Sequence, residues 1–129
     1  MEKFDYTVET ARNVDEAVAE IEAKAQEKGF RVLHVHDVQA TLSAKGFDIE
    51  PMKIVEVCNA RYASQVLAKD KKISLMLPCP ISVYTEQGTT YISALRPRVI
   101  ADFYPDANIE ETAGEVERAV LDVVNEAKL

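Results

Sequence analysis

The sequence of 129 residues contains no tryptophan, only two cysteines and no long hydrophobic run. Its longest apolar stretch, LMLPCPI, is interrupted by two prolines and is far shorter than the roughly 20 apolar residues of a membrane span. Two cysteines do not make the disulfide framework of a small secreted protein. The N-terminus MEKFDYTVET lacks the hydrophobic segment of a signal peptide. We therefore expect a cytoplasmic protein with reduced thiols.

Positive charge is also scarce, because 15 basic side chains face 22 acidic ones and the formal net charge is −7. Non-specific nucleic-acid binding needs a basic surface that displaces counterions from phosphates, and an anionic membrane attracts basic segments. We expect neither nucleic acid nor membrane among the partners. The 47% hydrophobic share is too high for a disordered chain, and the length is typical of one domain, which we place at residues 1–129.

The familiar motifs of catalysis and of cofactor binding are missing. The chain has no GxGxxG sequence, no phosphate-binding lysine loop and no GxSxG elbow. It therefore indicates no nucleotide site and no serine hydrolase, and it names no cofactor. Because no set of acid, base and nucleophile stands out, the sequence favours a binding or interaction module over an enzyme.

Hydrophobic periodicity predicts five strands and three main helices. The predicted strands cover residues 4–10, 30–37, 53–58, 81–86 and 89–95. The helices follow Asn13, Asn59 and Ile109, a short helical turn covers 38–45, and residues 96–106 read as a loop. A tight turn at Gln87-Gly88 makes the last two strands an antiparallel hairpin. We expect an α+β two-layer sandwich in which three helices cover one face of a mainly antiparallel sheet of about five strands.

The two cysteines form the first candidate site, together with Asn59. Cys58 ends a strand directly before the Asn59 helix cap, where the positive end of a helix dipole favours a thiolate. Cys79 lies between two prolines that lack an N–H, which predicts an edge or a bulge rather than a regular central strand. The alternative is that both cysteines are buried small hydrophobes without a role.

The order of the elements also predicts where the two thiols lie. The helix after Asn59 returns the chain across the sheet, and consecutive elements are usually neighbours in space. We therefore expect Cys58 and Cys79 at the same end of the sheet. If the next strand entered at the opposite end, the thiols would lie a strand length apart.

His34 and His36 form a second, weaker candidate site. Strict alternation along residues 30–37 puts both imidazoles on one face, with Val32, and puts Val35 on the other. Two imidazoles at this spacing can reach one metal ion, but a catalytic zinc site needs a third protein ligand, which the sequence does not supply. A solvated strand face is the favoured alternative.

Two stretches carry a family resemblance. Residues 54–59 read IVEVCN and residues 77–84 read LPCPISVY. With their surroundings these stretches resemble bacterial and archaeal proteins of domain-of-unknown-function family 302. The resemblance implies a TATA-binding-protein-like α+β fold assembled as a homodimer, and it implies no activity. The positions that match the family's most distinctive residues are Cys58, Asn59, Pro78 and Cys79.

Two departures from that family pattern limit what it implies. Ala60 stands where the family often has proline, and Pro80 stands where it often has a basic residue. An anion-binding role at position 80 is therefore not expected in this chain.

The sequence leaves three alternative functions open. The first is a small homodimeric module that binds a ligand or a partner, because one helical layer leaves the other sheet face to be covered. The second is a thiol-dependent redox or sulfur-handling protein that uses Cys58 and Cys79. The third is a metal-binding protein that uses His34 and His36.

Overall fold

The computed structural model describes residues 4–129, which form one antiparallel sheet and a set of helices. The strands, in the spatial order β1-β5-β4-β3-β2, are β1 (Asp5–Thr10), β2 (Arg31–Asp37), β3 (Met52–Cys58), β4 (Cys79–Glu86) and β5 (Thr89–Leu95). The α-helices are α1 (Val14–Glu27), α2 (Val38–Ser43), α3 (Ala60–Lys69), α4 (Arg98–Phe103) and α5 (Glu110–Ala127). Two 3₁₀ helices, η1 (Lys71–Met76) and η2 (Pro105–Ala107), complete the chain. The predicted α+β architecture with five antiparallel strands is confirmed.

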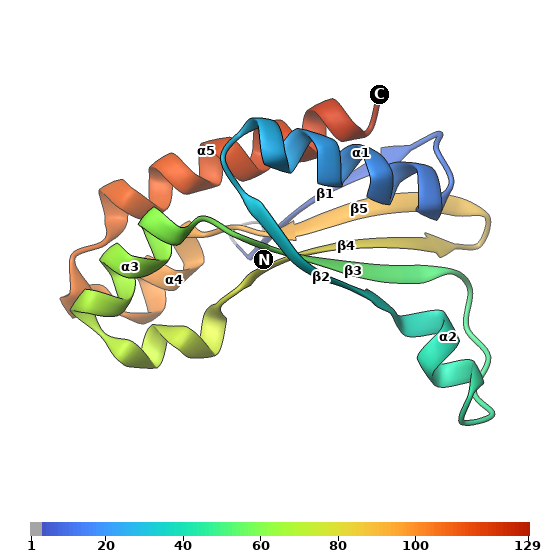
Figure 1. The fold of residues 1–129 in the computed structure, drawn as a ribbon, viewed down its shortest axis with the longest axis horizontal. Coiled ribbons are helices and arrows are strands. Elements are labelled where there is room, and N and C mark those ends of the chain that lie inside the picture. Colours follow the sequence, from blue (N-terminus) through green and yellow to red (C-terminus); the bar gives the residue numbers. More distant parts are fainter. Residues whose placement is uncertain (1–3) are drawn as a thin grey trace.

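Helices α1 and α5 lie together on one face of the sheet (Figure 1). Alternate side chains of the central strands point toward them and are fully buried, among them Val55, Ile81 and Ile92. Helix α1 begins as predicted, because the Asn13 Oδ1 accepts the Glu16 N–H at 2.8 Å while Glu16 accepts the Asn13 N–H. The apolar stripe of α1 faces the sheet and is buried, so the core lies between these two helices and the sheet.

The other face of the sheet has no helical layer (Figure 1). It is flanked by α2 at one end and by η1 at the other. Helix α2 begins directly after Asp37, whose Oδ1 accepts the Ala40 N–H at 2.9 Å and caps the helix. The hairpin turn adopts positive φ at both Gln87 and Gly88, which matches the right-handed twist of β4 and β5. We call this uncovered surface the open face.

Strict alternation along β2 is wrong. The register shifts between Val32 and His34, so that Leu33 is an extra residue in a bulge. Val32 therefore pairs with Val57 on the helix-covered face, whereas His34 and His36 lie on the open face. A bulge inserts one residue into the two-residue period, and the sequence pattern alone does not reveal it.

The prediction that Cys79 lies outside a regular central strand is also wrong. Cys79 is the first residue of β4, which is the middle strand of the sheet, and it pairs with Val57. Pro80 is tolerated because the ladder between β4 and β5 begins only at Ile81, so the first residues of β4 have a partner on one side only.

The segment predicted as a loop at 96–106 contains α4 and η2. Pro97 precedes α4 and Pro105 opens η2, positions at which the missing N–H costs no helical hydrogen bond. Val99 and Ile100 of α4 are buried.

Among residues 4–129, no helix is long and apolar enough to cross a membrane.

Candidate functional site

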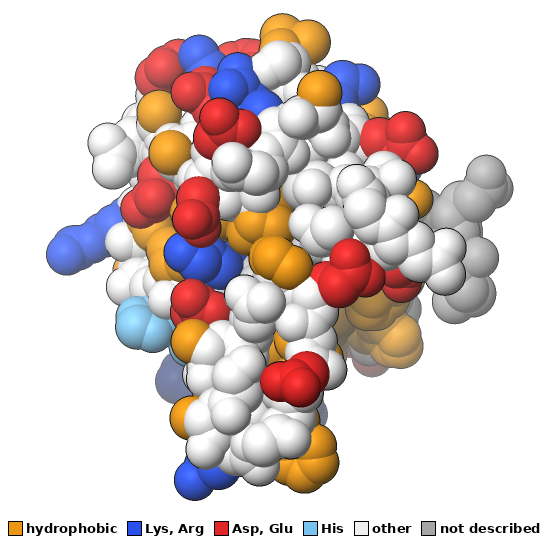
Figure 2. Space-filling model, turned by 90° about the vertical axis from the view of Figure 1, so that its right-hand side faces the viewer, with side chains coloured by type: hydrophobic (Ala, Val, Ile, Leu, Met, Phe, Trp, Pro, Cys, Tyr) orange, Lys and Arg blue, Asp and Glu red, His pale blue; other side chains and the backbone are white. Residues whose placement is uncertain are grey.

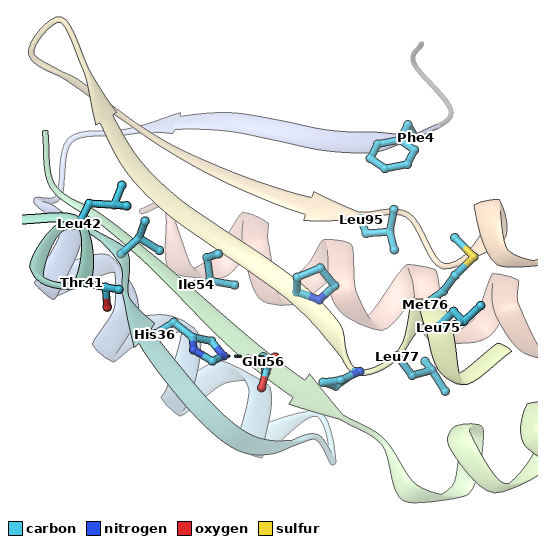
Figure 3. Close-up of a pocket in the computed structure, with 13 residues that line it drawn as sticks. Phe4, His36, Thr41, Leu42, Ile54, Glu56, Leu75, Met76, Leu77 and Leu95 are labelled. Carbon is cyan, nitrogen blue, oxygen red and sulfur yellow. Dashed lines mark ion pairs between the residues drawn. The ribbon is translucent and has the colours of Figure 1, made fainter. Parts of the chain in front are cut away.

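A groove on the open face of the sheet forms a hollow of about 660 Å³ among the described residues (Figure 3). One wall is formed by α2, through Thr41 and Leu42, and the opposite wall by Leu75 and Met76 of η1. Between them the floor is formed by side chains of the strands. The groove is therefore built by two short helices that flank an uncovered sheet, and its lining is mostly aliphatic.

One polar pair interrupts this apolar lining. The Nε2 atom of His36 in β2 lies 3.2 Å from the Oε2 atom of Glu56 in β3, and both side chains are partly exposed (Figure 3). The pairing follows from the register, because Glu56 pairs with His34 and Ile54 with His36, and all four side chains share the open face. The pair supplies a carboxylate and an imidazole to whatever occupies the groove.

His34 and His36 do lie together, as their spacing predicts. Their rings meet edge to face with centroids 4.3 Å apart. Among residues 4–129, no group of three His, Cys, Asp or Glu side chains is placed to hold a metal ion. Within the described residues the structure therefore gives His36 an ion-pair partner, Glu56, but gives the two histidines no set of metal ligands.

The two cysteines lie at the same end of the sheet, as the chain order predicts. Val57 pairs with Cys79, and Cys58 follows Val57 as the last residue of β3. Adjacent residues of a strand point to opposite faces, so Cys58 is directed away from the face that buries Cys79. Neither side chain is among those that line the groove. The two cysteines are therefore neighbours on adjacent strands of the sheet, but they lie outside the groove that holds the His36–Glu56 pair.

Cys79 is held in the protonated form. It is 4% exposed, and burial, followed by the nearby charge of Cys58, raises the pKa of the Cys79 thiol to about 12. The thiolate is the nucleophilic form of cysteine, so Cys79 is a poor nucleophile at neutral pH.

Asn59 serves the helix that follows it. Its Oδ1 accepts the N–H of Tyr62 at 3.0 Å and so caps α3, as predicted. The hydroxyl of Tyr62 is buried, and within residues 4–129 it is the one buried side-chain polar atom that has no hydrogen-bond partner. Burial, with Cys79 as the next cause, raises the pKa of Tyr62. At this end of the sheet the Cys79 thiol and the Tyr62 hydroxyl are therefore both buried.

Sequence reasoning found the histidines but missed Glu56 and the groove. The alternation of Ile54, Val55 and Glu56 shows that Ile54 and Glu56 share a face of β3. It does not show that this face is the uncovered one, nor that β2 lies beside it with both histidines on the same side.

Comparison with known proteins agrees with the fold. The family model named "Domain of unknown function DUF302" matches residues 6–127. A solved structure, that of an uncharacterized conserved DUF302 protein from Bacillus stearothermophilus, is similar with a TM-score of 0.90 and 32% sequence identity. The similarity covers 96% of this chain and 98% of that one. No curated protein matches the chain. The chain belongs to the DUF302 family.

Proposed function

We propose that the protein is a binding module that takes a small, largely apolar molecule into the groove on its open face. The observation that carries this proposal is the groove itself, a hollow of about 660 Å³ with mostly apolar walls around the His36–Glu56 pair. Small-molecule sites are typically clefts of roughly 300–1,000 Å³, mostly apolar, with few polar groups that orient the ligand. Both size and lining fit this description.

Binding in the groove would remove exposed apolar surface from water. Leu75 is 82% exposed and Phe4 is 48% exposed, although both border the groove. Covering apolar surface is worth about 25 cal/mol per Å². A ligand that fills the groove would therefore gain free energy from its own apolar surface and from that of these walls.

Binding of 1-decanol tests the proposal directly. We expect 1-decanol to displace an apolar fluorescent dye from the protein, and Leu42→Ser to weaken its binding about fivefold, because half of a leucine side chain contributes about 1 kcal/mol. Leu42 lies outside the main core, so this variant keeps the fold. The control is Leu121→Ser on α5, which is also partly buried and lies outside the groove; because Leu121 packs against the core, circular dichroism first checks that both variants are folded. Equal weakening in both variants, or no binding by the wild type, would contradict the proposal.

We also propose that the chain forms a homodimer. Leu33, Phe47 and Ile49 are exposed by 49%, 64% and 37%, and none of them lines the groove. Figure 2 shows hydrophobic side chains on both edges of the part that projects below the body. A second copy that packs on the loop between α2 and β3 would cover Phe47 and Ile49. Sedimentation equilibrium is expected to give twice the mass of the chain for the wild type and a shift toward the monomer for Phe47→Ser; a wild-type monomer at all concentrations would refute it.

A thiol-dependent function is a second proposal, and it rests on Cys58. Cys79 is buried and protonated, so a reactive thiolate would have to form at Cys58, which is partly exposed directly before the N-terminus of α3. The proposal needs a reduced Cys58, which fits a cytoplasmic compartment, where disulfides are rare. Iodoacetamide labelling followed by mass spectrometry is expected to modify Cys58 alone in the folded protein. Labelling of neither cysteine before denaturation would end this proposal.

A further inference from the structure

We infer that the ligand of the groove carries a protonated amine, or a similar organic cation, which Glu56 holds. This inference rests on the proposed function, because it names the class of molecule that the same groove takes. Among residues 4–129, Glu56 and His36 are the only titratable side chains in the lining, and no lysine or arginine of that range belongs to it. The groove therefore presents one carboxylate within an apolar surface, which complements an apolar molecule with a cationic head.

The geometry leaves Glu56 free to accept a further donor. Within residues 4–129, His36 is the one side chain that pairs with Glu56, and it does so at a single oxygen, Oε2. A carboxylate offers about four acceptor positions on its two oxygens. The side chain of Glu56 is 31% exposed, so a ligand head can reach it. Figure 3 shows Glu56 beside His36 and between the aliphatic side chains of Ile54 and Leu77, so that head and tail can be bound at once.

The charges around the groove disfavour a ligand with an anionic head. An anionic head would lie beside the Glu56 carboxylate, and His36 offsets that negative charge only when it is protonated. The whole chain carries a formal charge of −7 with neutral histidines, which attracts cations and repels anions before contact. Both the local and the overall field therefore favour an amine over a carboxylate on the same alkyl chain.

Three ligands of equal chain length separate the head from the tail: n-decylamine, 1-decanol and decanoate, measured by dye displacement at pH 8. The alkylamine is protonated there, as lysine is. We expect n-decylamine to bind the wild type about tenfold more tightly than 1-decanol, the effect of one partly exposed charged hydrogen bond, and decanoate to bind most weakly.

Two variants show whether Glu56 is responsible. Glu56→Gln keeps the shape of the side chain, so it should remove the preference for n-decylamine and leave the binding of 1-decanol within about twofold of wild type. The matched control is Glu9→Gln in β1, an exposed carboxylate on the open face outside the groove, which should keep the preference. Circular dichroism checks that both variants are folded.

The outcomes distinguish the inference from the proposed function. If 1-decanol binds and n-decylamine has no advantage, or keeps its advantage in Glu56→Gln, the cationic head is refuted while the apolar groove stands. If Glu9→Gln removes the advantage equally, general surface charge and not Glu56 causes it, and the inference is again refuted. If none of the three ligands binds, both the inference and the proposed function are overturned.

Discussion

The burial of Cys79 predicts a specific loss of stability in alkali. The thiol is 4% exposed, and its pKa in the folded protein is about 12 instead of the ordinary 9.0. Because the folded state resists ionisation, the unfolded chain releases its proton first as the pH rises. The stability that the protonated, buried Cys79 thiol contributes is therefore fully present below pH 9. It is lost progressively as the pH rises from about 9 toward 12.

The size of the effect follows from the two pKa values. Between pH 8 and pH 10 an unfolded thiol with a pKa of 9.0 changes from about one-tenth to about nine-tenths ionised, while the folded thiol stays protonated. Proton linkage converts this difference into a loss of about 1.4 kcal/mol in the free energy of unfolding. Other titrating groups, including Tyr62, change the stability of the wild type and of a variant that lacks only the thiol by almost the same amount. Their effect therefore largely cancels when the two proteins are compared.

Urea unfolding of the wild type and of Cys79→Ala at pH 8 and pH 10 measures this effect. At pH 8 the variant should be less stable by about 1 kcal/mol, because a buried sulfur is removed. At pH 10 the two proteins should be about equally stable, since only the wild type loses about 1.4 kcal/mol by proton linkage. If the gap between them is the same at both pH values, Cys79 ionises normally in the folded protein and the reasoning is refuted.

Three further substitutions test the packing by urea unfolding at pH 7.5. Tyr62→Phe removes a buried hydroxyl without a partner, so it should leave stability unchanged or raise it by up to about 1 kcal/mol, and a drop of that size would reveal a bonding partner. Asn13→Ala removes the Oδ1 atom that accepts the Glu16 N–H in the α1 capping box and should cost about 1 kcal/mol, whereas no loss would show that this cap is dispensable. Gly114→Ala should stabilise α5 by up to about 1 kcal/mol, because alanine has the higher helix propensity. The added Cβ would lie 3.1 Å from the Arg98 guanidinium, whose side chain is 62% exposed and can move away; destabilisation would mean that Arg98 cannot move.

Much of the fold is predictable because local signals and tertiary packing agree. The Asn13 and Asn59 caps, the apolar stripes of α1 and α5 and the Gln87-Gly88 turn each specify a local conformation that the structure keeps. The errors arise where a non-local partner decides. Pro80 can enter the middle strand because β5 begins to pair with β4 one residue later, and the buried side of α4 needs the rest of the core.

The candidate site was less predictable, because it depends on register. His34 and His36 are visible as an alternating pair, but the bulge at Leu33 decides which neighbours share their face. The ion pair with Glu56 requires the pairing of β2 with β3, and the groove requires α2 and η1 to flank the same face. None of these relations is local in the sequence. The spacing of residues along the chain therefore indicates the two cysteines as a candidate site and not the groove.

The most direct test of the groove is a titration of the ¹⁵N-labelled protein with 1-decanol, followed by NMR chemical shifts. The account predicts that the largest amide shifts cluster at Leu42, Ile54 and Leu77, which line the groove on three different segments. Amides of α1 and α5, on the other side of the sheet, should change little. Shifts that centre on α1 and α5, or no saturable shifts at all, would contradict the claim that the open face binds an apolar molecule.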